Sequence, residues 1–382
     1  MKHLKAEFIR FLESDPARLH FAAHSHHPWP DVSYEAHRQA WVDAADLMDD
    51  KWEHIFGTVV PRTRQQIAAI LGLSRDDTIT FAPNTHEFVV RLFSCFEPPV
   101  RILSTDAEFH TFTRQSQRWE EDGLAIVDRV PAEPFDTFTE RFMAEAGSAT
   151  HDMIFFSNVF FDSGFVVPHV EGIVSSVPDY APFIVIDGYH SFMALPVDLS
   201  SIQDRVFFIA GGYKYAMSGE GVCFMHCPPG YGDRPVNTGW YASFGHLEEG
   251  YSGKVPYNSD ASRFAGATFD HSAIYRMDAV LEWLSSEGVE PGVIHDYVRG
   301  LQDLFLDNIK KPPGRLIPAR STNRGNFLTF RSDDAFHYYR ALHDRRVVTD
   351  YRGDRLRMGF GIYHSERDVE RLIDIVSDLS LT

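Results

Sequence analysis

Cysteine is scarce in this sequence, with three residues in 382: Cys95, Cys223 and Cys227. An odd count, with two of the three in one apolar run, does not suit a disulfide scaffold and indicates reduced thiols, so we expect a cytoplasmic protein. Cys223 and Cys227 flank His226, but no second pair of ligands follows, and we expect no metal site.

Long apolar runs and positive charge are also lacking. No run approaches the roughly 18 apolar residues of a membrane span, and the charged N-terminal segment 1–15 has no signal-peptide core. We therefore expect no membrane partner. Lys and Arg number 36 against 54 Asp and Glu, a net charge of -18. Because phosphate backbones require clustered Lys and Arg, we expect no nucleic-acid partner either.

Three apolar runs organise the middle of the chain: Phe183–Ile186, Val206–Ala210 and Val222–His226. Runs of this length, bounded by Gly and Pro, are typical of strands covered on both faces, as in parallel α/β sheets. Chemistry in such sheets gathers outside the carboxyl ends of the strands. Asp187, His190 and Lys214 follow the first two runs and are therefore candidate site residues.

A lysine and a carboxylate at neighbouring strand ends suit pyridoxal 5'-phosphate (PLP). This cofactor forms a Schiff base with a Lys and needs an acid beside its pyridine nitrogen. The alternative from the residues alone is that Asp187 caps a loop and Lys214 is a solvated charge, since charged residues are mostly exposed.

The spelling D-x-x-H, then G-G-Y-K-Y, then G-E-G resembles the class V aminotransferase family of fold-type I PLP enzymes, which includes kynureninases and cysteine desulfurases. The D-x-x-H and Y-K-Y spellings are nearest the kynureninase branch. The resemblance implies that Lys214 forms the Schiff base and that Asp187 holds the pyridinium. It implies that His190 orients the phenolic oxygen or Asp187, and that Tyr213 reaches phosphate or donates a proton.

A strand at Thr78–Phe81, a turn and a helix starting near Thr85 form an anion-binding arrangement, because unpaired N–H groups and the helix dipole face outward. Asn84, Thr85 and His86 would supply the donors. An ordinary helix cap is the alternative, and the match to the family's phosphate loop favours cofactor binding.

Two further positions match phosphate contacts of the family. Trp240 lies in a Gly-Trp-Tyr that resembles the Gly-Trp-Trp of kynureninases, and Thr268 ends the segment FAGAT. In the family this Thr comes from the partner subunit, so the resemblance implies a homodimer with shared active sites.

The ring-stacking position of the family falls on Phe109, for which a flat π-face is the requirement. The alternatives are Phe109 as ordinary core and His110 as the stacking ring. In the loop after the strand Met153–Ser157, Asn158 and Phe161 could reach the cofactor ring or the substrate.

Substrate contacts are implied at both ends of the chain. Arg357 matches the Arg that grips the substrate α-carboxylate, a task suited to a planar guanidinium, although Arg352 and Arg355 stand nearby. The family's extended N-terminal segment covers the site mouth, which makes His24 and Ser25 candidate contacts.

The resemblance covers about residues 20–375 and implies an α/β fold-type I architecture. We expect a large lobe with a mostly parallel seven-stranded sheet plus a small C-terminal α/β lobe. The expected boundaries are 50–270 for the large PLP-binding domain and 1–49 with 271–382 for the small domain.

For activity, we favour a class V aminotransferase-like enzyme acting on an amino acid. The alternatives are kynureninase-like hydrolysis of a Cβ–Cγ bond and a non-catalytic PLP-binding homologue. A cysteine desulfurase needs a nucleophilic Cys in the C-terminal half, and no Cys follows Cys227. The sequence does not specify which amino acid is the substrate.

Overall fold

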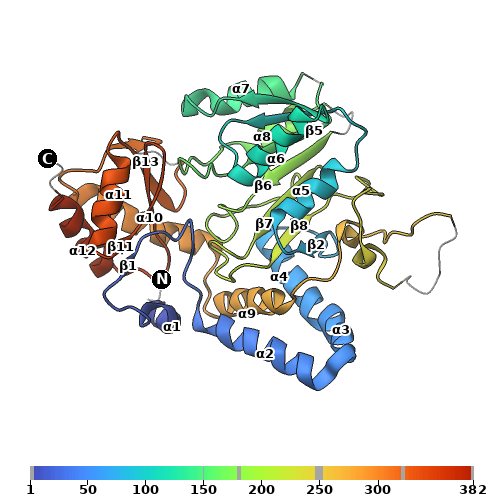
Figure 1. Ribbon diagram of the computed structural model, residues 1–382, viewed down its shortest axis with the longest axis horizontal. Coiled ribbons are helices and arrows are strands. Elements are labelled where there is room, and N and C mark those ends of the chain that lie inside the picture. The colour runs from blue at the N-terminus through green and yellow to red at the C-terminus, as the bar shows by residue number, and fades with distance from the viewer. Residues whose placement is uncertain (1–3, 149, 179–181, 246–252, 320–322, 380–382) are drawn as a thin grey trace.

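The computed structural model describes residues 4–148, 150–178, 182–245, 253–319 and 323–379. Two lobes are visible in Figure 1. The larger lobe holds a seven-stranded sheet with helices on its faces, and the smaller one holds a four-stranded sheet made by the C-terminal part of the chain. The predicted α/β architecture with a large lobe and a small C-terminal lobe is confirmed.

The large sheet has the strand order β2-β8-β7-β6-β5-β3-β4, and every strand runs the same way except β8. Its strands are β2 (Ile79–Ala82), β3 (Val100–Thr105), β4 (Ala125–Val130), β5 (Met153–Ser157), β6 (Phe183–Asp187), β7 (Val206–Gly211) and β8 (Cys223–His226). The apolar run Val222–His226, which contains β8, is of the kind that predicts a parallel strand. Residues 212–222 are too few for a crossover connection, so β8 returns antiparallel to β7.

The apolar runs are continuous because each face of the sheet has its own core. In β6 and β7, Ile184 and Phe208 join one buried cluster, while Val185 and Phe207 join the other. Successive side chains of a strand point to opposite faces, so a strand covered on both faces must be apolar throughout. The covering helices are α4 (Val60–Leu71), α5 (Thr85–Phe93), α6 (His110–Glu121), α7 (Phe138–Ala146) and α8 (Val170–Ser176).

The N-terminal helical segments are η1 (Lys5–Phe8), α1 (Ile9–Leu12), α2 (Asp31–Leu47), η2 (Met48–Asp50), α3 (Lys51–His54) and η3 (Ile55–Val59). Of these, α2 and α3 lie along the lower edge of the large lobe in Figure 1, where α2 packs against α9, and α1 lies farther left, below the small lobe. The long connecting helix expected from about Ser272 is two helices, α9 (Ser272–Ser286) and α10 (Pro291–Asn308). Gly288, at φ +66°, and Pro291 separate them.

The small lobe is an antiparallel sheet in the order β12-β13-β10-β9, joined by helices at the left of Figure 1. Its elements are β9 (Arg315–Ile317), β10 (Phe327–Arg331), α11 (Ala335–Asp344), β11 (Val347–Val348), β12 (Asp350–Arg352), β13 (Arg355–Gly359) and α12 (Glu366–Ser377). The predicted hairpin-like pair is confirmed, with Asp350 directly opposite Arg357. N-terminal β1 (Leu19–His20) pairs in parallel with β11, so the chain's start joins this lobe.

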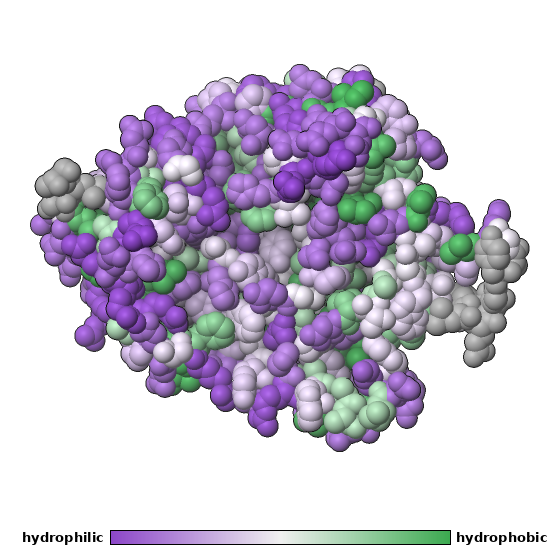
Figure 2. All heavy atoms as spheres, viewed as in Figure 1, coloured by the Kyte–Doolittle hydropathy of each residue, from purple (hydrophilic) through white to green (hydrophobic). Residues whose placement is uncertain are grey.

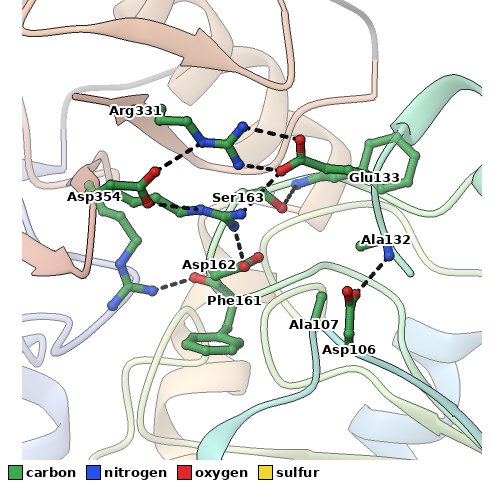
Figure 3. A network of polar contacts seen from close by, with 12 residues as sticks. Asp106, Ala107, Ala132, Glu133, Phe161, Asp162, Ser163, Arg331 and Asp354 are labelled. Carbon is green, nitrogen blue, oxygen red and sulfur yellow. Dashed lines mark hydrogen bonds and ion pairs between the residues drawn. The ribbon is translucent and has the colours of Figure 1, made fainter. Parts of the chain in front are cut away.

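Arginines of the small-lobe sheet form ion pairs with acidic residues in two loops of the large lobe (Figure 3). Arg331 donates to Glu133 at 3.1 Å, and Arg355 pairs with both Glu133 and Asp162. The face in Figure 2 is mostly hydrophilic and is hollowed near its centre, between the lobes. None of the described helices combines the length and apolar character needed to cross a bilayer.

Candidate active site

Asp187 ends β6 at the centre of the large sheet, level with Ser157 of β5 and Ile209 of β7. Its Oδ1 accepts the N–H of Tyr189 at 2.9 Å. Burial raises the pKa of Asp187, while the Tyr189 N–H and the positive charge of Lys214 act in the opposite direction. A cation placed beside this carboxylate would therefore be strongly held.

Lys214 follows β7 and its Gly211-Gly212 turn, and its Nζ is hydrogen-bonded to Nε2 of His190. Burial lowers the pKa of Lys214 to about 7 against the opposing effect of Asp187, and the charge of Arg357 lowers it further. Near neutral pH much of this amine is thus uncharged, as a nucleophilic lysine requires. Burial also holds the pKa of His190 well below its usual value, so the imidazole is neutral.

Two aromatic rings stand beside the lysine. Its Nζ lies 5.2 Å from the ring centroid of Phe109 and 5.3 Å from that of Tyr189. Phe109 keeps 41% of its surface exposed and meets Phe161 edge-on at 5.4 Å. His110 packs against Phe161 at 5.0 Å, so Phe109 rather than His110 is the ring beside Lys214.

The turn after Lys214 is shaped by glycine. Gly219 and Gly221 have φ of +72° and +93°, and a Cβ on Gly219 would lie 2.4 Å from the Trp29 ring. Arg276 of α9 donates from Nε to the Ser218 carbonyl at 2.7 Å and from Nη2 to the Glu220 carbonyl at 2.5 Å. These contacts fix the turn and, with it, the position of the lysine.

The N-terminus of α5 faces the same region. Asn84 caps the helix by accepting the Glu87 N–H at 3.1 Å, and the backbone of Thr85 bonds the thiol of Cys223. That thiol donates to the Tyr189 hydroxyl at 3.5 Å, which links α5 to the ring beside Lys214. Nδ1 of His86 is buried without a hydrogen-bond partner.

Trp240 and Thr268 meet each other, with Trp240 Nε1 donating to Thr268 Oγ1 at 3.0 Å, and both are exposed. No hydrogen bond or ring contact between described residues joins this pair to α5 or Lys214 within the chain. The loop that carries Trp240 continues into 246–252, which lies outside the described residues.

Arg357 lies on β13 and is 3% exposed. Its Nη2 donates to Asp350 and its Nη1 to the carbonyl of Phe161, while Nε is buried without a partner. Arg352 shares the Asp350 carboxylate with Arg357, donating to its other oxygen at 2.7 Å, while Arg355 pairs with Asp162. Of the three arginines, only Arg357 is buried, and its charge lowers the pKa of Lys214 more than that of Arg352 does.

The two N-terminal candidates, His24 and Ser25, have different surroundings. His24 is buried, stacks on Phe327 at 4.6 Å and has both ring nitrogens without partners, with Nε2 3.9 Å from Asp350. Burial, with Arg357 and Lys214 nearby, lowers its pKa well below the usual value. Ser25 is half-buried and its N–H donates to Ala22.

The side chain of Tyr213 packs against the N-terminal segment. Its ring stacks on His26 at 5.4 Å, and burial raises the pKa of its hydroxyl. The described contacts therefore place Tyr213 against the N-terminal segment, and its assignment to phosphate or to proton donation stays a prediction.

The residues present fit PLP. An amine of lowered pKa, a carboxylate at the end of the next strand and an exposed aromatic face suit the aldehyde, the ring nitrogen and the ring. The unpartnered His190 Nδ1 and His86 Nδ1 are free to bind oxygen atoms of a ligand.

Four residues near the site were missed from the sequence: Glu108, Tyr189, Arg276 and Asp350. Tyr189 lies inside the D-x-x-H motif and Glu108 directly before Phe109, so their positions in the motifs were a usable signal. Arg276 and Asp350 come from distant segments, and only the fold brings them here.

Comparison with known proteins agrees with this geometry. Residues 297–376 match the family model "Kynureninase C-terminal domain". The isopenicillin N epimerase of Streptomyces clavuligerus is 26% identical over 356 residues, covering 84% of each chain. This level of identity leaves the activity open.

Two solved structures share the fold. A cysteine desulfurase from Thermococcus onnurineus superposes with a TM-score of 0.81 at 15% identity, covering 95% of this chain and 94% of that one. A mutant of C-DES with glycine covalently linked to its PLP cofactor gives 0.79 at 15%, covering 97% and 99%. The chain thus has the fold of the class V, PLP-dependent aminotransferases, within fold type I.

Proposed function

We propose that this protein is a PLP-dependent enzyme that acts on an α-amino acid. The observation that carries the proposal is Lys214, a buried amine with a pKa lowered to about 7, whose Nζ lies 5.2 Å from the ring centroid of Phe109 and interacts with the charge of Asp187 at the end of the neighbouring strand. Lys214 would hold PLP covalently until the amine of the substrate displaces the lysine, and the chemistry that PLP would then supply is electron withdrawal that acidifies the substrate's Cα proton.

The chain's own residues would divide the work. Asp187 holds the pyridine nitrogen in its protonated form, and Phe109 covers a ring face. Lys214 Nζ would take and return the Cα proton of the substrate, and neutral His190, hydrogen-bonded to that amine, would position it. Asn84, Thr85 and His86 bind the phosphate at the α5 terminus.

Arg357 and His24 would select the substrate. Arg357 is a buried guanidinium from the small lobe, with an unpartnered Nε, that acts electrostatically on Lys214. A carboxylate fits a guanidinium in two parallel hydrogen bonds, which orients the amino acid's Cα toward the lysine. His24, neutral and with both ring nitrogens free of hydrogen bonds, would add a contact beside it.

For the reaction we favour class V aminotransferase-like chemistry. Epimerisation at Cα is the second candidate, supported by the similarity to isopenicillin N epimerase along most of the chain. Desulfurase chemistry is disfavoured, because Cys223 is buried in β8, Cys227 is buried directly after it, and no Cys follows them. Kynureninase-like hydrolysis stays an alternative.

One experiment separates these reactions. Purified protein loaded with PLP is incubated in D2O with kynurenine, isopenicillin N or a panel of amino acids, with and without a keto-acid acceptor. Transamination gives a new keto acid that requires the acceptor, epimerisation gives the deuterated mirror-image centre, and hydrolysis of kynurenine gives anthranilate. Absence of any Cα–H exchange would contradict catalysis and favour a non-catalytic PLP-binding homologue.

We further propose a cytoplasmic homodimer with shared active sites. Trp240 and Thr268 are exposed and bonded to each other, apart from Lys214, as expected if they complete the phosphate site of a partner. Mixing inactive Lys214→Ala subunits with Thr268→Ala subunits should then restore part of the activity. A fully active monomer in sedimentation would contradict this arrangement.

A further inference from the structure

Glu108 is a buried carboxyl group with no assigned task. It directly precedes Phe109 and is 3% exposed. Its Oε1 accepts the Thr105 hydroxyl at 2.7 Å and the Ser157 N–H at 3.1 Å, and its Oε2 accepts the Ser157 hydroxyl at 2.6 Å. Because carboxyl groups are rarely buried unless paired, three donors on an interior Glu indicate a built arrangement.

Ser157 connects this group to Asp187. The two residues are register partners at the ends of β5 and β6, and the next N–H, of Asn158, donates to the Asp187 carbonyl at 2.9 Å. The same Ser157 gives both its donors to Glu108. The carboxyl group of Glu108, in the loop after β3, and that of Asp187, at the end of β6, are therefore linked through Ser157 at the end of β5, the strand between β3 and β6.

The charges of the two groups are linked. Burial raises the pKa of Glu108 to about 7, the hydrogen bonds from Ser157 and Thr105 oppose it, and the negative charge of Asp187 adds to it. The positive charge of Lys214 in turn lowers the pKa of Asp187. The neighbouring Asp106 points toward Ala132 and accepts its N–H at 2.7 Å (Figure 3). Asp187 is thus the charged group that acts on Glu108.

We propose that Glu108 is a positioning residue for the cofactor, a second carboxyl whose charge strengthens the grip of Asp187 on a protonated pyridine nitrogen. The inference rests on the proposed function and extends it. Above neutral pH an anionic Glu108 adds a negative charge near the pyridinium and the imine, and both hold their protons to higher pH. Below neutral pH Glu108 is neutral and this help is lost.

The test is a spectrophotometric pH titration of the PLP-loaded protein, which follows the visible absorbance of the imine on Lys214. Glu108→Gln keeps the shape but removes the charge. The imine of the variant should deprotonate about one pH unit lower than in the parent, the size expected for one charge several ångströms away. The two proteins should give the same spectrum below about pH 6, where Glu108 is protonated in the parent.

Ser157→Ala supplies an independent variant that keeps Glu108 itself. It removes the hydroxyl that stabilises the anion, so Glu108 should stay neutral to higher pH and the titration should move in the same direction by a smaller amount. Thr105→Val should do likewise if Glu108→Gln fails to fold. Superimposable titrations of parent and variants would overturn the inference. A parent protein that takes up no PLP would instead overturn the proposed function.

Discussion

The two halves of the candidate site are built differently. The large-lobe half consists of groups at the ends of β5, β6 and β7, fixed by the sheet register, with Lys214 and Asp187 as its centre. The small-lobe half consists of Arg357, Asp350 and His24, held by a hairpin and by the N-terminal segment. The first half sets pKa values by burial, and the second presents charge that a substrate can engage.

The difference indicates separate tasks for the two lobes. Groups fixed at the strand ends of the sheet stay in place whatever the substrate, which suits cofactor chemistry. Arg357 instead shares its guanidinium with Asp350 and the Phe161 carbonyl, contacts that an α-carboxylate would adjust or share. Changes in the large lobe should therefore alter chemistry, and changes in the small lobe should alter substrate use.

Lys214→Ala should have the largest effect. The variant lacks the amine that bonds the cofactor and moves the Cα proton, so turnover with every amino acid should end while PLP still binds non-covalently through Asp187 and the α5 terminus. Turnover assays and cofactor retention on gel filtration check this. Lys254→Ala, at an exposed position, is the control. Residual turnover at the parent rate would remove Lys214 from the mechanism.

Arg357→Lys should lower kcat/KM by roughly ten- to a hundred-fold, because a charge-assisted pair worth about 1.5–3 kcal/mol loses its two-point geometry. PLP affinity should be unchanged, which separates the two halves of the site. Arg355→Lys is the matched control on the same strand, since Arg355 pairs with Asp162 and Glu133. If Arg355→Lys failed and Arg357→Lys did not, the carboxylate contact would lie with Arg355.

The stability of the cofactor-free protein should depend on pH through Lys214. Its pKa is about 7 when folded and near 10.5 when unfolded, so between these values the unfolded chain binds more protons and stability should rise with pH. In Lys214→Ala this rise should be absent. Urea unfolding at pH 7 and pH 9.5 gives the free energy of unfolding of both proteins at each pH. An equal change between the two pH values in the parent and in Lys214→Ala would show that the lysine is not buried as described.

The smallest effect should come from Ser365→Ala in the small lobe, away from the site. Ser365 and Asp368 form a capping box at the start of α12, so its loss should cost about 1 kcal/mol of stability. Steady-state constants should stay at parent values, with Ser377→Ala at the other end of the helix as the control. A change in KM would mean that the stability of the small lobe affects substrate binding even when the changed residue lies away from the site.

The sequence indicated the strand ends of the large-lobe half from its own apolar runs, whereas Arg357 and His24 of the small-lobe half were named only through the family resemblance and Asp350 was not named. Asp187 and Lys214 follow apolar runs whose length and Gly boundaries identify buried strands, and Phe109 and Asn84 stand at fixed places beside such strands. The Arg357–Asp350 pair and the approach of His24 depend on how a hairpin and the N-terminal segment dock, for which local periodicity gives no signal. The reversal of β8 and the division of α9 from α10 likewise depend on connection length and on backbone at Gly288.

Borohydride reduction of the PLP-loaded protein, followed by peptide mapping, tests the central claim most directly. Borohydride reduces the C=N bond between cofactor and lysine to a secondary amine, which does not hydrolyse and therefore survives peptide mapping. The account predicts a yellow protein whose label lies on the peptide containing Lys214, with no label in Lys214→Ala. A label on another lysine, or no label on a protein that binds PLP, would contradict it.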